Sequence, residues 1–198
     1  MNQQTLFFIG RSGSGKGTQA KLVIKYLEKN DPDRKVFYLE SGEKFRTLIA
    51  GTTYTSELSR KINIVGGLQP EFLAIWIWST LLVENMTGKE HVIFDGVPRK
   101  RHEASVLDSA MGFYGREKPT VIFIDVSREW SKERLLARKR ADDTASDIEA
   151  RLNWFDTDVV PTIAYFKENP MYEVHQINGE RTIEEIHTDI LEKLGWQK

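Results

Sequence analysis

A glycine-rich loop with one lysine is the part of this 198-residue sequence best suited to chemistry. The loop, GRSGSGKGT at residues 10–18, follows a short apolar run and precedes a helical pattern. Its glycines let backbone N–H groups turn inward, and the start of the helix adds donors, so the loop can cradle phosphate oxygens. Lys16 adds a charge suited to the β- and γ-phosphates of a nucleoside triphosphate. The pattern predicts a triphosphate site; the alternative is a flexible glycine loop.

The loop departs from the strict phosphate-loop pattern at one position. That pattern has Ser or Thr directly after the lysine, where its hydroxyl holds Mg²⁺. Here Gly17 follows Lys16, and the hydroxyl comes one residue later, at Thr18. We therefore expect Thr18 to bond a phosphate rather than the metal.

Apolar, β-branched segments alternate with helical patterns along the whole chain. The predicted strands are 5–9, 36–39, 91–94, 120–125 and 172–177. The predicted helices are about 16–29, 43–50, 56–64, 71–84, 102–114, 130–139, 146–168 and 183–194, and Pro161 is expected to bend the seventh. This alternation predicts an α/β fold, a five-stranded parallel sheet flanked by helices, with ligands beyond the carboxyl ends of the strands.

The composition excludes several classes of protein. Lys and Arg total 28 against 29 Asp and Glu, a near-balance that argues against a partner such as a nucleic acid polymer. Cysteine is absent, which excludes disulfides and cysteine-based zinc sites and fits the cytoplasm. No signal peptide is visible, and the longest apolar stretch, residues 72–83, falls short of the roughly 20 residues that span a bilayer. We expect one soluble cytoplasmic domain over residues 1–198.

Four further segments give the chain a resemblance to a known family. GSGKGTQA, from Gly13, resembles the phosphate loop of the adenylate kinase family. SGEKFR at 41–46, GGLQP at 66–70 and FDGVPR at 94–99 are similar, in the same order, to the family's monophosphate-side motifs. The arginines between residues 134 and 151 resemble its lid and post-lid arginines. The match covers nearly the whole chain.

The resemblance implies Mg²⁺-dependent phosphoryl transfer from ATP to a nucleoside monophosphate, most often AMP, giving two diphosphates. It also implies a monomer with a helical monophosphate-binding arm at 41–67 and a minimal lid at 138–143. Phosphoryl transfer needs aligned phosphates, neutralised charge and excluded water rather than covalent help, and a phosphate loop with scattered arginines supplies those parts.

The resemblance also implies roles for individual residues. The implied ATP-binding residues are Gly13, Ser14, Gly15, Lys16, Gly17, Thr18 and Arg134. The implied monophosphate-binding residues are Ser41, Gly42, Arg46, Gly96, Arg99 and Glu103. The implied catalytic residues are Lys16, Arg99, Arg138, Arg140 and Arg151. Asp142 and Asp143 would orient these arginines, and the alternative for either is a place at the start of a helix.

Asp95 ends a predicted strand and is expected to anchor Mg²⁺ through water, because a hard cation prefers oxygen ligands and keeps its hydration shell. Each role has a structural alternative. Asp95 is suited to forming a turn before Gly96, Arg46 and Arg99 to surface salt bridges, and Arg134 to a solvated helix face. Phe45, Trp76 and Trp78 are expected to pack in the core rather than stack on a base.

Two positions depart from the family pattern. Only Lys139 separates Arg138 from Arg140, where the family carries a longer loop, so we expect some hydrolysis of the triphosphate without transfer. Glu103 stands four residues after Arg99, where adenylate kinases place a glutamine that reads adenine. An ionised glutamate only accepts hydrogen bonds; this suits guanine's two donors or the one donor of cytosine, but it repels adenine's ring acceptor. The alternative is that Glu103 lies in solvent and His102 reads the base.

Three hypotheses follow. The first is a nucleoside monophosphate kinase. The second is another small-molecule kinase with a phosphate loop, which the ordered motifs around Arg46 and Arg99 disfavour. The third is a nucleotide-binding module or slow ATPase that regulates a partner, which the retained Lys16, Arg138 and Arg151 disfavour.

Overall fold

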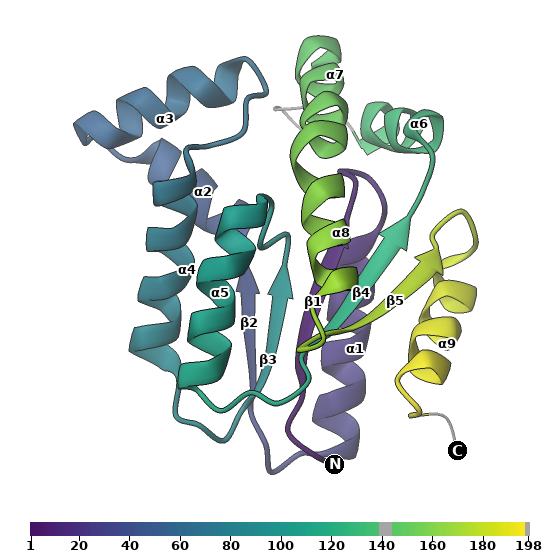
Figure 1. The fold of residues 1–198 in the computed structure, drawn as a ribbon. Coiled ribbons are helices and arrows are strands. Elements are labelled where there is room, and N and C mark those ends of the chain that lie inside the picture. The colour runs from purple at the N-terminus through teal and green to yellow at the C-terminus, as the bar shows by residue number, and fades with distance from the viewer. Residues whose placement is uncertain (139–143, 197–198) are drawn as a thin grey trace.

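The centre of the molecule is a five-stranded, all-parallel sheet with strand order β2-β3-β1-β4-β5 (Figure 1). The computed structural model describes residues 1–138 and 144–196. The strands are β1 (Thr5–Gly10), β2 (Val36–Glu40), β3 (His91–Asp95), β4 (Thr120–Asp125) and β5 (Glu173–Asn178). The predicted fold class is therefore confirmed, and each predicted strand is found to within one residue at either end.

The helices follow the predicted pattern except near Pro161. They are α1 (Lys16–Asn30), α2 (Ser41–Ala50), α3 (Tyr54–Ile64), α4 (Glu71–Asn85), α5 (Arg101–Phe113), α6 (Arg128–Arg138), α7 (Ala145–Trp154), α8 (Val160–Glu168) and α9 (Ile183–Lys193). The predicted single helix over 146–168 is instead two helices joined by a π-helical turn, η1 (Phe155–Val159). Pro161 lies in the first turn of α8, directly after this π-helical turn, and has no backbone N–H to donate.

Helices cover both faces of the sheet, as the near-continuous apolar strands require. On one face, side chains of α1 and α9 such as Leu27 and Ile190 pack against Phe8 of β1. On the other face, α4, α5 and α8 cover Phe7 and Phe94, whose rings stack with centroids 4.4 Å apart. Helices α2 and α3 lie beyond one side of the sheet's carboxyl end, and α6 and α7 beyond the other (Figure 1).

The strand order brings the functional loops together. β1 lies between β3 and β4, so the phosphate loop leaves the middle of the sheet. β2 pairs with β3 such that Glu40 and Asp95 are register partners, which sets two carboxylates at neighbouring strand ends. Ligands of parallel sheets bind at such switch points.

Helix α4 corrects one sequence-based prediction. Trp78 and Phe45 are buried, as expected, but Trp76 is 54% exposed. The helix is apolar around its whole circumference, so its periodicity does not distinguish the buried face, which carries Leu73, Ile77 and Leu82, from the exposed one. None of the helices over the described residues has the length and apolarity that a bilayer crossing requires.

Candidate active site

The phosphate loop owes its shape to glycines. Gly13 and Gly15 adopt φ values of 86° and 88°, in the left-handed region that side chains disfavour, and α1 begins directly after Gly15. A Cβ on Gly10 would lie 2.6 Å from the backbone oxygen of Ile124. The loop therefore presents its backbone to a ligand at the start of a helix, an arrangement that favours anions.

Lys16 is the central cation of the cleft. Burial lowers its pKa, Asp95 opposes that shift, and the guanidiniums of Arg99 and Arg138 reinforce it. Because cations surround it, the ammonium gains most when a phosphate enters the cleft. This is the environment expected of a lysine that binds the transferring phosphoryl group.

Asp95 is held by one oxygen only. Its Oδ2 accepts a hydrogen bond from the Tyr38 hydroxyl at 2.9 Å, while its buried Oδ1 has no hydrogen-bond partner among the described residues. A Cβ on Gly17 would lie 3.0 Å from Oδ2, so the glycine lets this carboxylate approach the start of α1 closely. A fixed carboxylate with one unused oxygen in a phosphate cleft fits a Mg²⁺ ion bound through water. The described residues hold no cluster of three His, Asp or Glu side chains that would bind a metal without a nucleotide.

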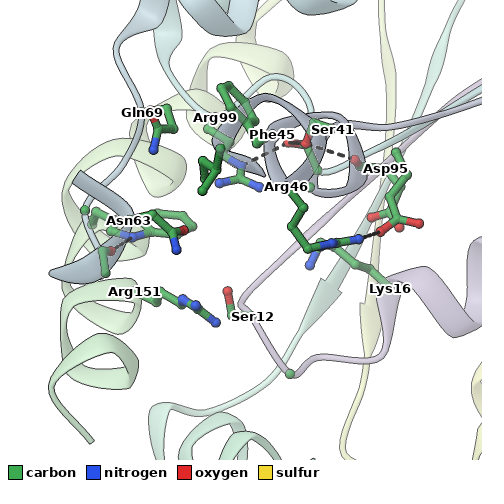
Figure 2. Close-up of a pocket in the computed structure, with 18 of the residues that line it drawn as sticks. Ser12, Lys16, Ser41, Phe45, Arg46, Asn63, Gln69, Asp95, Arg99 and Arg151 are labelled. Carbon is green, nitrogen blue, oxygen red and sulfur yellow. Dashed lines mark hydrogen bonds and ion pairs between the residues drawn. The ribbon is translucent and has the colours of Figure 1, made fainter. Parts of the chain in front are cut away.

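The predicted arginines converge on this cleft. Arg46 from α2, Arg99 from the loop after β3, Arg138 at the end of α6 and Arg151 of α7 line the same cavity as Lys16. Figure 2 shows Arg46, Arg99 and Arg151 around the space that Lys16 and Asp95 border. Arg46 and Arg99 therefore share one cleft with Lys16, although Arg46 also forms a half-exposed salt bridge with Glu40.

Arg99 and Arg46 are held differently. The Arg99 Nε–H donates to Gly96 O at 3.1 Å, and its guanidinium lies 5.2 Å from the centre of the Trp154 ring. Burial lowers the pKa of Arg99, and Glu103 and Asp95 oppose the shift. Arg46 is half-exposed, and its Nη2 donates to Glu40 Oε1 at 3.0 Å. Arg46 thus lines the cleft while paired with a carboxylate.

Small residues bring the backbone close to these arginines. The Ser41 hydroxyl donates to Gly96 O at 3.0 Å, which ties the start of α2 to the loop after β3. Gly96 has a φ of 73°, and a Cβ on Gly42 would lie 3.2 Å from Arg46 Nη1. These three predicted residues all line the cleft.

Glu103 faces a recess of the cleft rather than solvent. It is 2% exposed, and its Oε2 accepts a hydrogen bond from the Arg99 backbone N–H at 3.1 Å. Burial raises the pKa of this carboxyl, although the Arg99 N–H and guanidinium oppose the shift. His102 is exposed, contacts Glu71 and is not among the residues that line the recess, and Glu103 does not lie in solvent as the alternative required.

Not all predicted residues line the cleft. Of the loop, Gly13 and Lys16 do, whereas Ser14, Gly15, Gly17 and Thr18 are not among its lining residues. Arg134 is exposed and lies 4.7 Å from the centre of the Trp130 ring. Arg140, Asp142, Asp143 and most of the predicted lid lie outside the described residues.

The sequence-based prediction missed several residues of the site. Tyr38 and Glu40 are two residues apart at the end of β2, directly before the predicted Ser41-Gly42 segment. Their nearness to that segment was the sequence signal that could have identified them. Trp154 donates through its Nε1–H to Gly66 O at 3.2 Å and thereby joins α7 to the end of the arm. Arg11 contacts Asp156 at 2.7 Å and lies over Phe155, so it joins the phosphate loop to η1.

Comparison with known proteins decides the family. A family model described as adenylate kinase matches residues 8–171. The chain belongs to the adenylate kinase family. An adenylate kinase of Campylobacter hominis is 34% identical over 187 residues, covering 92% of this chain and 91% of that protein. Adenylate kinase 1 of a Synechocystis species is 32% identical over 193 residues, covering 96% and 95%.

As an adenylate kinase family member, the protein is a phosphotransferase of the nucleoside monophosphate kinase class. An adenylate kinase of Leuconostoc mesenteroides matches at 27% identity over 96% of this chain and 97% of its own length. The first of the three hypotheses is thus confirmed over a kinase of unrelated small molecules.

Proposed function

We propose that the enzyme transfers the γ-phosphoryl group of ATP to AMP, with Mg²⁺, and releases two molecules of ADP. The observation that supports this most is the single cleft in which the phosphate loop and Lys16 face Arg46, Arg99, Arg138 and Arg151. Two phosphate chains meeting end to end carry several negative charges, and only a site lined by opposed cations neutralises them while excluding water.

The residues divide by the side of the cleft from which they act. Lys16 and the backbone of the phosphate loop hold the triphosphate. Arg46 and Arg99 hold the phosphate of the monophosphate by paired hydrogen bonds, which planar guanidiniums favour. Arg138 and Arg151 neutralise the phosphoryl group in transit, and Arg140 is assigned to the same task from the sequence. When bound, Mg²⁺ adds charge neutralisation at the β- and γ-phosphates.

Asp95 would hold that ion through water, because Tyr38 fixes one carboxylate oxygen and the other has no partner among the described residues. The attacking oxygen belongs to the monophosphate, so no side chain needs to act as a nucleophile. The chain's task is alignment and shielding, both of which depend on closure of the cleft.

Residues 41–67 form the arm that we assign to the monophosphate, and 138–143 the minimal lid, within one kinase domain that acts as a cytoplasmic monomer. The bond between Trp154 and Gly66 O supports an arm that folds over the substrate, because it already joins the arm's end to α7. We expect this contact to persist or tighten when both nucleotides bind.

A coupled assay that detects ADP tests the proposal. With ATP, AMP and Mg²⁺, two ADP should form for each ATP consumed, and Arg99→Met should reduce kcat/KM for AMP about 100-fold or more. Arg128→Met, which removes an arginine bonded to Glu149 and Asp156 outside the cleft, serves as control. A rate of ATP hydrolysis that is the same with and without AMP would instead indicate the slow ATPase.

A further inference from the structure

One side chain of the phosphate loop bonds distant parts of the chain instead of lining the phosphate cleft. Among the described residues Lys16 lines that cleft, but Arg11 of the same loop does not. The Arg11 Nε–H donates to Val126 O, directly after β4, at 3.2 Å, and its Nη2 lies 2.7 Å from Asp156 Oδ1 in η1. The Arg11 guanidinium also lies 4.3 Å from the centre of the Phe155 ring. Arg11 therefore joins the loop to β4 and to η1.

The backbone of the loop has few other features that hold its shape. Glycines occupy positions 10, 13, 15 and 17, and glycine loses more conformational freedom on folding than other residues. The Ser14 N–H donates to Arg11 O at 3.1 Å and closes a turn within the loop. The Ser14 hydroxyl, in contrast, is buried and has no hydrogen-bond partner among the described residues. Arg11 is thus the side chain that fixes the loop to its surroundings, and backbone donors fixed in advance bind a ligand at a lower entropic cost.

The contacts of Arg11 are poorly suited to stabilising the fold. The Asp156 side chain is 44% exposed, and a pair with so much access to water contributes little to stability. The Nη1 of Arg11 is buried and has no hydrogen-bond partner among the described residues, which is unfavourable for a charged donor. Both Phe155 and Asp156 belong to a π-helical turn, an element that is rare and is frequent at functional sites. These features favour a role for Arg11 in the function of the loop.

The segment that Arg11 contacts continues into a helix of the active site. Helix α7 leads directly into η1, and its Arg151 lines the same cleft as Lys16. In Figure 1 the loop between β1 and α1 lies beside the junction of α7 and α8, where the contact between Arg11 and Asp156 is made. The contact therefore fixes the phosphate loop relative to the helix that carries an opposing arginine.

We propose that Arg11, through Asp156 and Phe155, is a positioning residue that holds the phosphate loop in the shape and place required to bind the triphosphate opposite Arg151. The inference rests on the proposed function, in which this loop holds ATP. Arg11 acts through the loop backbone and does not itself contact the substrate. Alignment of the reacting phosphates is the main requirement of phosphoryl transfer, so a loop that shifts on its base loses both affinity and rate.

The proposal predicts an effect on one nucleotide and not on the other. The arginines assigned to the monophosphate have other partners, because Arg46 pairs with Glu40 and the Arg99 Nε–H donates to Gly96 O. Loss of the Arg11 contacts should therefore weaken the binding of ATP and leave that of AMP unchanged. A general loss of structure would weaken both.

Calorimetry with each nucleotide alone tests this prediction. In Arg11→Met, which keeps an unbranched apolar stem, the Kd for a non-hydrolysable ATP analogue with Mg²⁺ should rise about tenfold, and the Kd for AMP should not change. With both substrates saturating, kcat should fall about tenfold to 100-fold. Arg128→Met is the matched control, since it removes the other arginine from the Asp156 carboxylate and leaves the loop contact in place. Arg128→Met should bind both nucleotides as the wild type does, and the melting temperatures should all agree within about 4 °C.

A double-mutant cycle identifies the partner through which Arg11 acts. Asp156→Ala, at a half-exposed position, should raise the Kd for the ATP analogue in the same direction. The double variant should bind no more weakly than Arg11→Met, because both changes break one contact. Arg11→Lys, which keeps the charge but not the planar fork, should recover part of the affinity.

Three results would overturn the inference. These are unchanged binding of the ATP analogue in Arg11→Met, equal weakening of ATP analogue and AMP, and additive losses in the double variant. If the wild type forms ADP from ATP and AMP while any of these results is found, only this inference fails. If the wild type forms no diphosphate from any monophosphate, the proposed function itself fails.

Discussion

Two buried glutamates lie toward opposite ends of the parallel sheet and differ in their hydrogen bonds and in the direction of their pKa shifts. Glu90 precedes β3 at the amino end, is 5% exposed, and accepts hydrogen bonds from Thr87, Gly88, Lys89 and Arg116. Burial alone would raise its pKa, but these donors lower the pKa to about 2. Glu90 is thus a fully bonded anion that stabilises the fold.

Glu103, at the carboxyl end, accepts one hydrogen bond from the backbone of Arg99, and burial raises its pKa. Asp95 nearby likewise has one oxygen without a partner among the described residues. The difference suggests a distinction between buried carboxyl groups that serve the fold and those that serve a ligand: Glu90 has donors within the chain for both oxygens, whereas Glu103 and Asp95 each have a described donor for one. Variants at each end test that distinction.

The largest effect on stability is expected at the amino end. Arg116→Met leaves Glu90 without its cation and should lower the free energy of unfolding by about 3–5 kcal/mol. Urea denaturation measures this change, and kcat of the remaining folded enzyme should be retained. The exposed pair Lys61–Glu57 is the control, because Lys61→Met should cost less than about 1 kcal/mol. Equal losses in the two variants would contradict the distinction.

At the carboxyl end the largest effect is expected on catalysis. Lys16→Met removes the central cation of the cleft and should reduce kcat about 100- to 1,000-fold. Stability should be unchanged or higher, because burial of the Lys16 charge is unfavourable without a phosphate. Steady-state kinetics and thermal melting check this, with the exposed Lys21→Met of α1 as control. A melting temperature that falls with kcat would show Lys16 to be structural.

The two glutamates should also differ in how stability depends on pH. The folded pKa of Glu90 lies below its ordinary value, so its contribution is present above about pH 4.5 and lost as the pH falls toward 2. Glu90→Gln should cost on the order of 2 kcal/mol at neutral pH and flatten the acid limb. Glu103 has the opposite sign: its contribution is lost as the pH rises through its raised folded pKa, so Glu103→Gln should stabilise the neutral protein. Urea denaturation midpoints, measured at intervals of about one pH unit from pH 3 to 8, give the pH dependence of both variants. Destabilisation by both substitutions would refute the contrast.

The smallest predicted effect concerns Tyr38. Tyr38→Phe removes the bond that orients Asp95 and should reduce kcat about tenfold while raising the Mg²⁺ concentration for half-maximal activity. The Asp95 carboxylate raises the pKa of the Tyr38 hydroxyl further than burial alone, so that hydroxyl remains a donor. Tyr26→Phe, whose hydroxyl bonds Trp196 O instead, is the control. An unchanged Mg²⁺ dependence in Tyr38→Phe would contradict the role of Tyr38 in orienting Asp95.

Most of the fold was predictable from local patterns. The alternation of apolar strands and amphipathic helices fixes the sheet, and the glycine loop with Lys16 marks its ligand end. The exposed face of α4 was not predictable, because a helix that is apolar all round gives no periodic signal at Trp76. The π-helical turn at 155–159 was missed because Pro161 signals a break without specifying its geometry.

Residues that line the candidate cleft were predictable where a motif names them, as for Arg46, Arg99 and Asp95. Tyr38 and Glu40 come beside Asp95 through strand register, and the bond of Tyr38 to Asp95 joins residues far apart in sequence that only the folded chain brings together. The same holds for the raised pKa of Glu103, whose largest cause is burial.

The most direct test of the account is the binding of a two-headed ligand, two adenosines joined by a chain of five phosphates. If one cleft holds two nucleotides tail to tail between the phosphate loop and the arginines, calorimetry should show one ligand per chain. Saturating ATP or saturating AMP should each weaken that binding, and Lys16→Met and Arg99→Met should both reduce the affinity. Two ligands per chain, or competition by ATP alone, would contradict the shared cleft.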